Sequence, residues 1–194
     1  MKLLKSVTLL SAVILFNMST LSAQIPDKAE DISPLLIGEV LPNSELTKAD
    51  GSTAKFYDVI KEKPTVLVFY RGGWCPYCNM QLSALAIAEE EILELGYQIV
   101  AVSPDSFENI EPTVEKDKVK YSIYSDAGGK FSQEAGIAFK LSPEKARQKK
   151  TETLPVPTVF VTDTKGQILF EYISPNYKKR MTPELLMAVL KNLE

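Results

Sequence analysis

The chain contains no histidine and only two cysteines among its 194 residues. The absence of histidine excludes Ser-His-Asp hydrolases, Cys-His proteases, histidine-ligated zinc enzymes and haem proteins with a histidine ligand. Two cysteines are too few for a four-thiolate zinc or iron–sulfur site. The sequence therefore indicates neither a cofactor nor a metal. Any chemistry has to come from side chains other than histidine.

Long apolar runs are also scarce. Residues 1–23 begin with a short basic segment, continue with an apolar run from Val7 to Phe16 and end in Leu21-Ser22-Ala23. This pattern is typical of a signal peptide, and we expect cleavage after Ala23. A retained membrane anchor is the alternative, but the run is shorter than the ~20 residues that span a bilayer. We expect an exported, periplasmic protein, with secretion from the cell left open.

The rest of the chain has the composition of a globular protein, with 45% hydrophobic and 24% charged residues over the full sequence. Residues 24–33 are interpreted as a linker and residues 34–194 as one domain. Loss of Lys2 and Lys5 with the signal takes the 22 basic residues to 20, against 25 acidic ones. This acidic balance gives no electrostatic reason to bind nucleic acid, and no apolar segment is left to hold the mature chain in a membrane.

Both cysteines lie in one tetrapeptide, Cys75-Pro76-Tyr77-Cys78. A disulfide that closes so short a loop restricts the unfolded chain very little, so stability is a poor reason for it. The spacing favours a redox dithiol, in which one sulfur attacks and the other resolves. Two incidental buried thiols and a Cu(I)-binding pair are the alternatives.

The residues around the dithiol predict a strand, a tight turn and a helix. Thr65 to Tyr70 is an apolar, β-branched run of the kind found in buried strands. From Pro76 onward apolar residues recur every three or four positions until Gly96. The dithiol therefore lies at a helix N-terminus, where free backbone N–H groups stabilise a thiolate.

The remaining elements alternate between strand and helix, which predicts an α/β fold with a mixed sheet. A charged segment between them, residues 140–153, is expected to be an inserted surface helix or loop. We expect Ser103 or Asp105 to cap the helix that follows them. The expected strands are 97–103, 121–124, 158–161 and 167–172, and the expected helices are 107–114, 130–135 and 182–192.

Several stretches match one known family in order along the chain. They are residues 38–42 (GEVLP), 50–51 (DG), 66–70 (VLVFY), 102–106 (VSPDS), 124–126 (YSD) and 163–166 (DTKG). With the dithiol, they resemble the peroxiredoxin-like (alkyl hydroperoxide reductase C/thiol-specific antioxidant) family of the thioredoxin superfamily, in a subgroup that carries a CxxC motif. The resemblance covers residues 34 to 194. It implies a thioredoxin-like fold, with a mixed central sheet flanked by helices and a peroxiredoxin-type N-terminal extension.

The resemblance also shows where this chain departs from the family. It puts Cys78 at the peroxidatic position, Cys75 where a Thr stands and Arg71 where a Pro stands. The family's distant Arg is replaced by Pro157. Two of the three positions of the family's peroxidatic triad, those of the Thr and of the distant Arg, therefore depart from the pattern, which puts peroxide reduction by the usual geometry in question.

A second likeness is to thioredoxin itself. Val156-Pro157 enters a strand as the cis-proline segment of thioredoxins does, and the resemblance predicts a cis bond that presents a backbone edge to a disulfide substrate. An ordinary trans proline is the alternative. The buried acid of thioredoxins is replaced by Val68, so proton transfer requires another group or water.

These likenesses leave two schemes open. In the thioredoxin scheme Cys75 attacks and Cys78 resolves, whereas in the peroxiredoxin scheme Cys78 is oxidised and Cys75 condenses with it. Arg71 either supplies the positive charge of the missing arginine or is an exposed loop residue, and Trp74 packs beside the dithiol or forms a substrate platform. The expected function is reduction of hydroperoxides with a thioredoxin-like reductant, or reduction of protein disulfides.

Overall fold

The computed structural model describes residues 24–193. The predicted signal peptide, residues 1–23, lies outside this range, so its prediction stays open. Within residues 24–193 no helix combines the length and the apolar character that crossing a bilayer would need.

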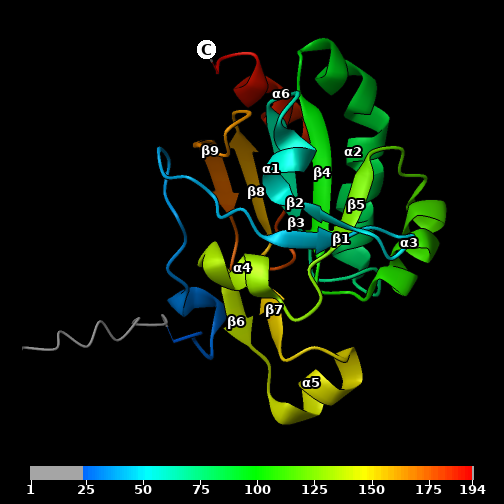
Figure 1. Ribbon diagram of the computed structural model, residues 1–194, viewed down its shortest axis with the longest axis vertical. Coiled ribbons are helices and arrows are strands. Elements are labelled where there is room, and N and C mark those ends of the chain that lie inside the picture. The colour runs from blue at the N-terminus through cyan, green and yellow to red at the C-terminus, as the bar shows by residue number, and fades with distance from the viewer. Residues whose placement is uncertain (1–23, 194) are drawn as a thin grey trace, which may run out of the picture.

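The centre of the molecule is a seven-stranded mixed sheet with the order β2-β1-β5-β4-β3-β8-β9 (Figure 1). β3 pairs in parallel with β4, and β4 with β5, whereas the remaining pairs are antiparallel. This architecture confirms the predicted α/β fold. The strands are β1 (Glu45–Thr47), β2 (Thr53–Lys55), β3 (Thr65–Phe69), β4 (Gln98–Ser103), β5 (Ser122–Ser125), β8 (Thr158–Thr162) and β9 (Ile168–Ile173).

Helices cover both faces of this sheet (Figure 1). On one face α2, α3 and α6 pack against one group of buried side chains, and on the other α1 and α4 pack against a second group. The helices are α1 (Phe56–Ile60), α2 (Pro76–Glu94), α3 (Ile110–Asp117), α4 (Lys130–Glu134), α5 (Pro143–Lys149) and α6 (Pro183–Leu190), with short 3₁₀ turns η1 (Ala29–Asp31) and η2 (Phe107–Asn109).

The central elements follow from their residues. All five residues of β3 are buried, because parallel strands with helices on both faces have no solvent side. α2 begins with Cys75 as N-cap and Pro76 at the first position, where a missing N–H costs nothing. Gly96, with φ of +86°, ends it. The chain therefore passes from the buried strand β3 through a short turn into the dithiol and α2.

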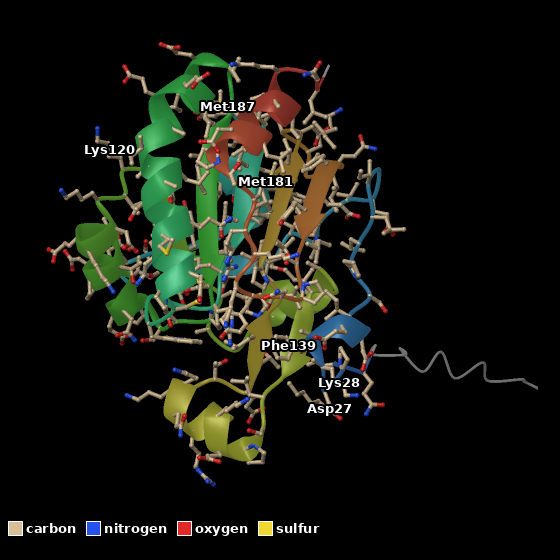
Figure 2. All side chains as sticks on the ribbon, turned by 180° about the vertical axis from the view of Figure 1, so that it is seen from behind. Asp27, Lys28, Lys120, Phe139, Met181 and Met187 are labelled. Atoms are coloured by element: carbon tan, nitrogen blue, oxygen red, sulfur yellow. The ribbon has the colours of Figure 1, made fainter. Side chains whose placement is uncertain are left out.

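The two groups of buried side chains have different compositions. The group between the sheet and α2 contains both cysteines together with Leu82 and Ile92. Met181, just before α6, and Met187, within it, are labelled in Figure 2 and belong to the same group. The group on the other face is aromatic, with Phe56, Phe69, Phe131 and Phe160 in contact. The dithiol is therefore part of a core and not of a surface loop.

A small hairpin stands apart from the main sheet. β6 (Ala138–Lys140) pairs antiparallel with β7 (Thr153–Pro155), and α5 connects them. The hairpin and α5 extend from one end of the molecule (Figure 1), and they account for the predicted surface insertion 140–153. The N-terminal segment runs along it, since the Lys140 N–H donates to the Pro26 carbonyl at 2.8 Å.

Two features differ from the sequence-based expectations. The hairpin of β1 and β2 and the short helix α1 were not predicted, because each strand has three residues without a clear alternation. The predicted capping by Ser103 or Asp105 is wrong. Ser106 precedes η2 and makes no side-chain cap bond, and the Asp105 carboxylate instead accepts the Gly73 N–H.

Candidate functional site

The two cysteines lie where β3 passes through a turn into α2. Cys75 and Cys78 are free thiols, 1% and 0% exposed. The Cys75 N–H donates to the Gly72 carbonyl, and the Cys75 carbonyl accepts the N–H groups of Cys78 and Asn79 at 3.0 and 3.1 Å. These bonds hold both sulfurs within the first turn of the helix, as the spacing predicted.

A guanidinium contacts both sulfurs. Arg180 Nη2 lies 3.3 Å from Cys78 Sγ and 3.9 Å from Cys75 Sγ. Arg180 belongs to the loop between β9 and α6. Its Nε and Nη1 atoms are buried without a hydrogen-bond partner among the described residues. The site therefore combines a dithiol with a guanidinium whose Nε and Nη1 donors are free to bind a ligand.

The two thiols differ in acidity. The Cys75 pKa is lowered from 9.0 to about 5, first by the hydrogen bond from the Cys78 thiol, then by a backbone bond from Cys78 and by the charges of Arg180 and Arg71. The Cys78 pKa is raised, first by burial and then by that same hydrogen bond. One proton is thus shared between the sulfurs, and Cys75 carries the negative charge.

The guanidinium distances alone would favour Cys78 as the thiolate, since Arg180 lies nearer to it. Burial decides against this assignment, because desolvation penalises the charged form most at the fully enclosed sulfur. Cys75 is the N-cap residue, so its sulfur lies at the positive end of α2. The electrostatics therefore favour the thioredoxin scheme, in which Cys75 attacks.

Arg71 and Trp74, both predicted as supporting residues, form a stack beside the dithiol. The Arg71 guanidinium lies 5.2 Å from the centroid of a Trp74 ring and 4.3 Å from that of Tyr177. The ring centroids of Tyr177 and Tyr77 lie 5.8 Å apart, in an edge-to-face arrangement. Arg71 is thus half-buried between two aromatic rings, and the same loop that brings Arg180 supplies Tyr177.

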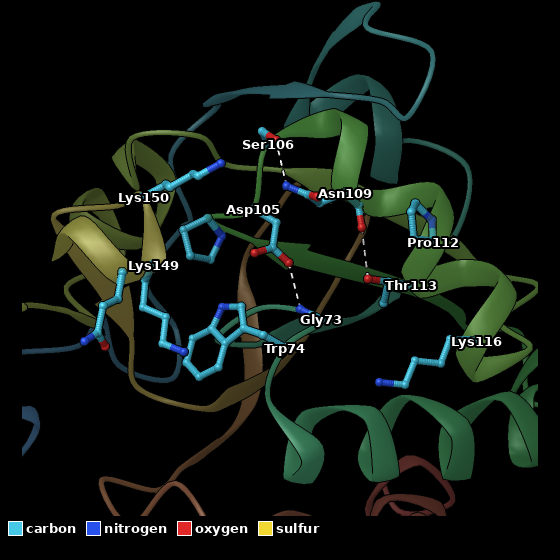
Figure 3. A pocket seen from close by; sticks show the side chains of 12 residues that line it. Gly73, Trp74, Asp105, Ser106, Asn109, Pro112, Thr113, Lys116, Lys149 and Lys150 are labelled. Atoms are coloured by element: carbon cyan, nitrogen blue, oxygen red, sulfur yellow. Dashed lines mark hydrogen bonds between the residues drawn. The ribbon is translucent and has the colours of Figure 1, made fainter. Parts of the chain in front are cut away.

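Asp105 holds the turn before the dithiol by a hydrogen bond to the backbone. Its carboxylate accepts the Gly73 N–H at 2.7 Å, and the Gly73 carbonyl accepts the Asn79 side-chain amide at 2.9 Å. Figure 3 shows the Asp105 bond, with Thr113 packed close to Gly73. A Cβ at position 73 would overlap the Thr113 hydroxyl, so the turn requires glycine there.

The segment Val156-Pro157 lies beside the end of β3, but its predicted cis peptide bond is wrong. The described residues contain no cis peptide. Val156 donates its N–H to Ile137, and Pro157 accepts the Ser174 N–H. The first bond continues the β6–β7 pairing and the second continues the β8–β9 pairing. Both therefore hold the backbone just before β8 in place. Both residues are buried, so no free backbone edge is presented here.

The residue that the sequence reasoning missed is Arg180. It belongs to the loop after β9, and the Ser174 N–H at the exit of β9 donates to the Pro157 carbonyl, so this loop begins next to the position where the family pattern has its arginine. A signal was available, because the chain has only three arginines, Arg71, Arg147 and Arg180. The sequence does not show which of the three arginines lies near the dithiol, because this depends on the pairing of β8 with β9 in three dimensions.

The fold and the dithiol together define a class of protein: a thiol-dependent oxidoreductase with a thioredoxin-like fold. The AhpC/TSA family matches residues 37–170 of the chain. The chain belongs to the AhpC/TSA family, as its motifs indicated.

Individual relatives agree with this assignment. Chloroplastic peroxiredoxin Q of Triticum aestivum is 28% identical over 156 residues, covering 80% of this chain and 67% of that protein. Peroxiredoxin Bcp of Escherichia coli is 22% identical over 160 residues, covering 82% and 98%. The chain covers only 55 to 63% of the length of six other plant peroxiredoxin Q sequences.

The fold also matches solved structures. Reduced Prx3 of Vibrio vulnificus in complex with hydrogen peroxide superposes with a TM-score of 0.72 at 16% identity, over 80% of this chain and 99% of that one. At this identity the likeness establishes the fold alone. It confirms the peroxiredoxin-type arrangement of sheet and helices.

Proposed function

We propose that this protein is a thiol peroxidase that reduces hydroperoxides through Cys75 and Cys78. The observation that carries the proposal is the position of Arg180, whose guanidinium contacts both sulfurs and has buried donors without partners. A peroxidase needs a thiolate and hydrogen-bond donors for the two peroxide oxygens. Arg180 serves both needs.

The first chemical step is attack of the Cys75 thiolate on one peroxide oxygen. The O–O bond breaks, Cys75 becomes a sulfenic acid, and the departing alkoxide or hydroxide takes up a proton. Arg180 Nε and Nη1, with Arg71 Nε, are the donors that would bind the oxygens, since all three atoms are buried and unpartnered within residues 24–193. They stabilise negative charge as it moves to the leaving oxygen.

The second step closes the disulfide. Cys78, protonated and adjacent, attacks the Cys75 sulfenic acid and releases water. The sum is one hydroperoxide and one dithiol giving one alcohol or water, one further water and one disulfide. Both sulfurs already lie on one helical turn, so this step needs no partner chain.

Burial favours peroxide over a protein disulfide as the substrate. Cys75 is 1% exposed and Cys78 is fully enclosed, which suits a molecule of two or a few heavy atoms. A protein disulfide needs an exposed sulfur and a free backbone edge, and the trans, buried Val156-Pro157 segment offers no such edge.

The cycle requires an external reductant for the Cys75–Cys78 disulfide. We expect a thioredoxin-type donor, as the family resemblance implies, and this requires the oxidised Cys75–Cys78 pair to be more exposed than the two buried thiols of the reduced protein. We further expect the protein to be exported, with cleavage after Ala23 and a periplasmic location. N-terminal sequencing of the protein recovered from its native cells checks the cleavage site, and an uncleaved N-terminus in the membrane fraction would contradict it.

The test uses Trp74, the chain's only tryptophan, as a reporter next to Cys75. Reduced mature protein is mixed with hydrogen peroxide in a stopped-flow instrument and its fluorescence is followed. We expect oxidation orders of magnitude faster than that of free cysteine. Cys75→Ser should abolish it, whereas Cys78→Ser should keep one rapid oxidation and stop at a sulfenic acid that dimedone traps on Cys75.

Two results would contradict the proposal in different ways. A rate equal to that of free cysteine would leave no peroxidase. Rapid oxidation that survives Cys75→Ser and is lost in Cys78→Ser would keep the peroxidase but reverse the roles of the two sulfurs.

A further inference from the structure

The outer face of α2 carries exposed apolar side chains near its middle. Met80 is 68% exposed and Ile87 is 87% exposed. They are seven residues apart, so both lie on the same side of the helix, and α2 has no charged residue before Glu89. Figure 2 shows α2 at the surface, with α3 on one side of it and α6 on the other. The exposed side of a helix is normally polar, so this face indicates a contact with another molecule.

A hollow of about 570 Å³ lies next to Ile87, between α2 and α3. Its walls include Met80, Ser83 and Ala84 of α2 together with Lys116 and Asp117 of α3. The same face therefore presents both a protruding isoleucine and a hollow lined by small and apolar side chains. Two identical surfaces of this kind fit each other, because in a two-fold symmetric interface each copy fills the hollow of the other.

The C-terminal part of α2 is acidic. Glu90 and Glu94 are exposed and form no ion pair within residues 24–193, whereas Glu91 pairs with Lys191 at 3.0 Å. The last turn of α2 has no basic residue, although negative charge at the C-terminus of a helix is unfavourable. This end of the helix therefore attracts cations from outside α2.

The N-terminal half of the same face is bordered by basic residues. Lys116 lines the hollow with Met80 and Ser83, and Lys118 lies close by, next to Ser83 and Ile87. Both lysines are exposed, and neither forms an ion pair with another described residue. Unpaired positive charge thus borders one half of the face and unpaired negative charge lies on the other half, so the face is complementary to an inverted copy of itself.

We propose that this face of α2 binds a second copy of the chain, with a two-fold axis between two antiparallel α2 helices. Ile87 of each copy enters the hollow beside Ser83 of the other copy. In this register Glu90 lies opposite Met80 of the second copy, because three residues separate each of them from the first contact. Lys116 lines the same hollow as Met80, so Glu90 of each copy pairs with Lys116 of the other.

Parallel helices would not satisfy these charges. The glutamates of both copies would then meet at one end of the interface and the lysines at the other, and like charges repel. The antiparallel arrangement also aligns the two helix dipoles in opposite directions. The contact involves neither cysteine, so the inference does not depend on the proposed function.

Analytical ultracentrifugation of the reduced mature protein, from micromolar to millimolar concentration, measures the association. A reducing agent is present so that disulfides between chains do not contribute, and no peroxide is added. The apolar contact is removed with Ile87→Gln. Leu93→Gln is the matched control, because Leu93 is 42% exposed on the same helix and lies outside the hollow.

We expect the native protein to dimerise reversibly and Ile87→Gln to weaken the dimer at least tenfold, because the burial of an isoleucine side chain is lost twice. Leu93→Gln should leave the association unchanged. A protein that stays monomeric over the whole range, or equal effects of the two substitutions, would overturn the proposal.

An exchange of charges tests the antiparallel arrangement. Lys116→Glu and Glu90→Lys should each weaken the dimer about fivefold, the size of two exposed ion pairs, and the protein with both substitutions should regain the native affinity. Lys145→Glu controls for net charge, since Lys145 lies exposed on α5, and should have no effect. No recovery in the double variant, or equal weakening by Lys145→Glu, would show that the copies do not meet in this way.

Discussion

Arg180 Nη2 lies 3.3 Å from Cys78 Sγ, although 102 residues separate the two in the chain. The family pattern places its arginine at the start of the strand that here begins after Pro157. In this chain the guanidinium comes from the loop that follows the neighbouring strand, β9. The positive charge at the sulfurs therefore comes from a different segment of this chain than the one that the family pattern indicates.

Removing that charge should raise the Cys75 pKa. We expect Arg180→Gln to raise it, because the charge of Arg180 is one of the causes that lower the pKa, and to slow oxidation by roughly a factor of 10², the usual loss when a donor to the developing negative charge is removed. The pH dependence of iodoacetamide alkylation and the stopped-flow rate measure both effects. Arg147→Gln, on the exposed side of α5, should change neither, and an unchanged pKa in Arg180→Gln would contradict the assigned role.

The shifted Cys75 pKa also predicts how stability depends on pH. The folded thiol has a pKa of about 5, against 9.0 for the ordinary group. Between these values the unfolded state binds more protons, so the contribution of Cys75 to the free energy of unfolding grows as pH rises and is lost as pH falls toward 5. Cys78, whose pKa is raised, stays protonated in both states well below pH 9 and does not oppose this trend there.

Urea unfolding of the reduced native protein and of Cys75→Ser at pH 5.5, 7 and 8.5 measures the contribution. The difference in free energy between the two proteins should grow from the lowest pH to the highest. A constant difference would show that Cys75 is not a stabilised thiolate.

Gly73 should tolerate no side chain while Thr113 is present. A Cβ at position 73 would overlap the Thr113 hydroxyl, so we expect Gly73→Ala to cost about 1–3 kcal/mol, the usual penalty for overpacking. Thermal unfolding measures it. Adding Thr113→Ala should recover part of the loss, and strictly additive effects of the two substitutions would exclude the steric cause.

Asp105 should act as the acceptor that holds the turn. Asp105→Ala leaves the Gly73 N–H without its partner and should cost about 1–3 kcal/mol. Burial raises the Asp105 pKa, so the ionised carboxylate is itself unfavourable there. Asp105→Asn keeps an acceptor oxygen without the charge, and chemical denaturation should find it more stable than Asp105→Ala.

Local features of the site could be predicted from the sequence. Strand β3, the turn and α2 are consecutive in the chain, and their apolar spacing and Pro76 specify where each begins. The helix start at Thr182 was also predicted, and its hydroxyl accepts the Leu185 N–H. Such features depend on neighbours in sequence, for which residue spacing is sufficient.

Non-local features could not be predicted in this way. Arg180 reaches the sulfurs only because β9 pairs with β8 and β8 with β3, and no spacing rule encodes two successive pairings. The cis prediction at Pro157 failed for a related reason. It relied on a likeness to thioredoxin in a few residues, whereas the backbone there follows its bonds to Ile137 and Ser174.

The late position of Arg180 has a consequence for how the protein matures. Synthesis proceeds from the N-terminus, so both cysteines emerge long before their arginine. Until the loop after β9 docks, the thiols lack the charge of Arg180, which is one of the causes that lower the Cys75 pKa. The Cys75 thiolate therefore receives its full stabilisation only after the last part of the chain has been made and folded.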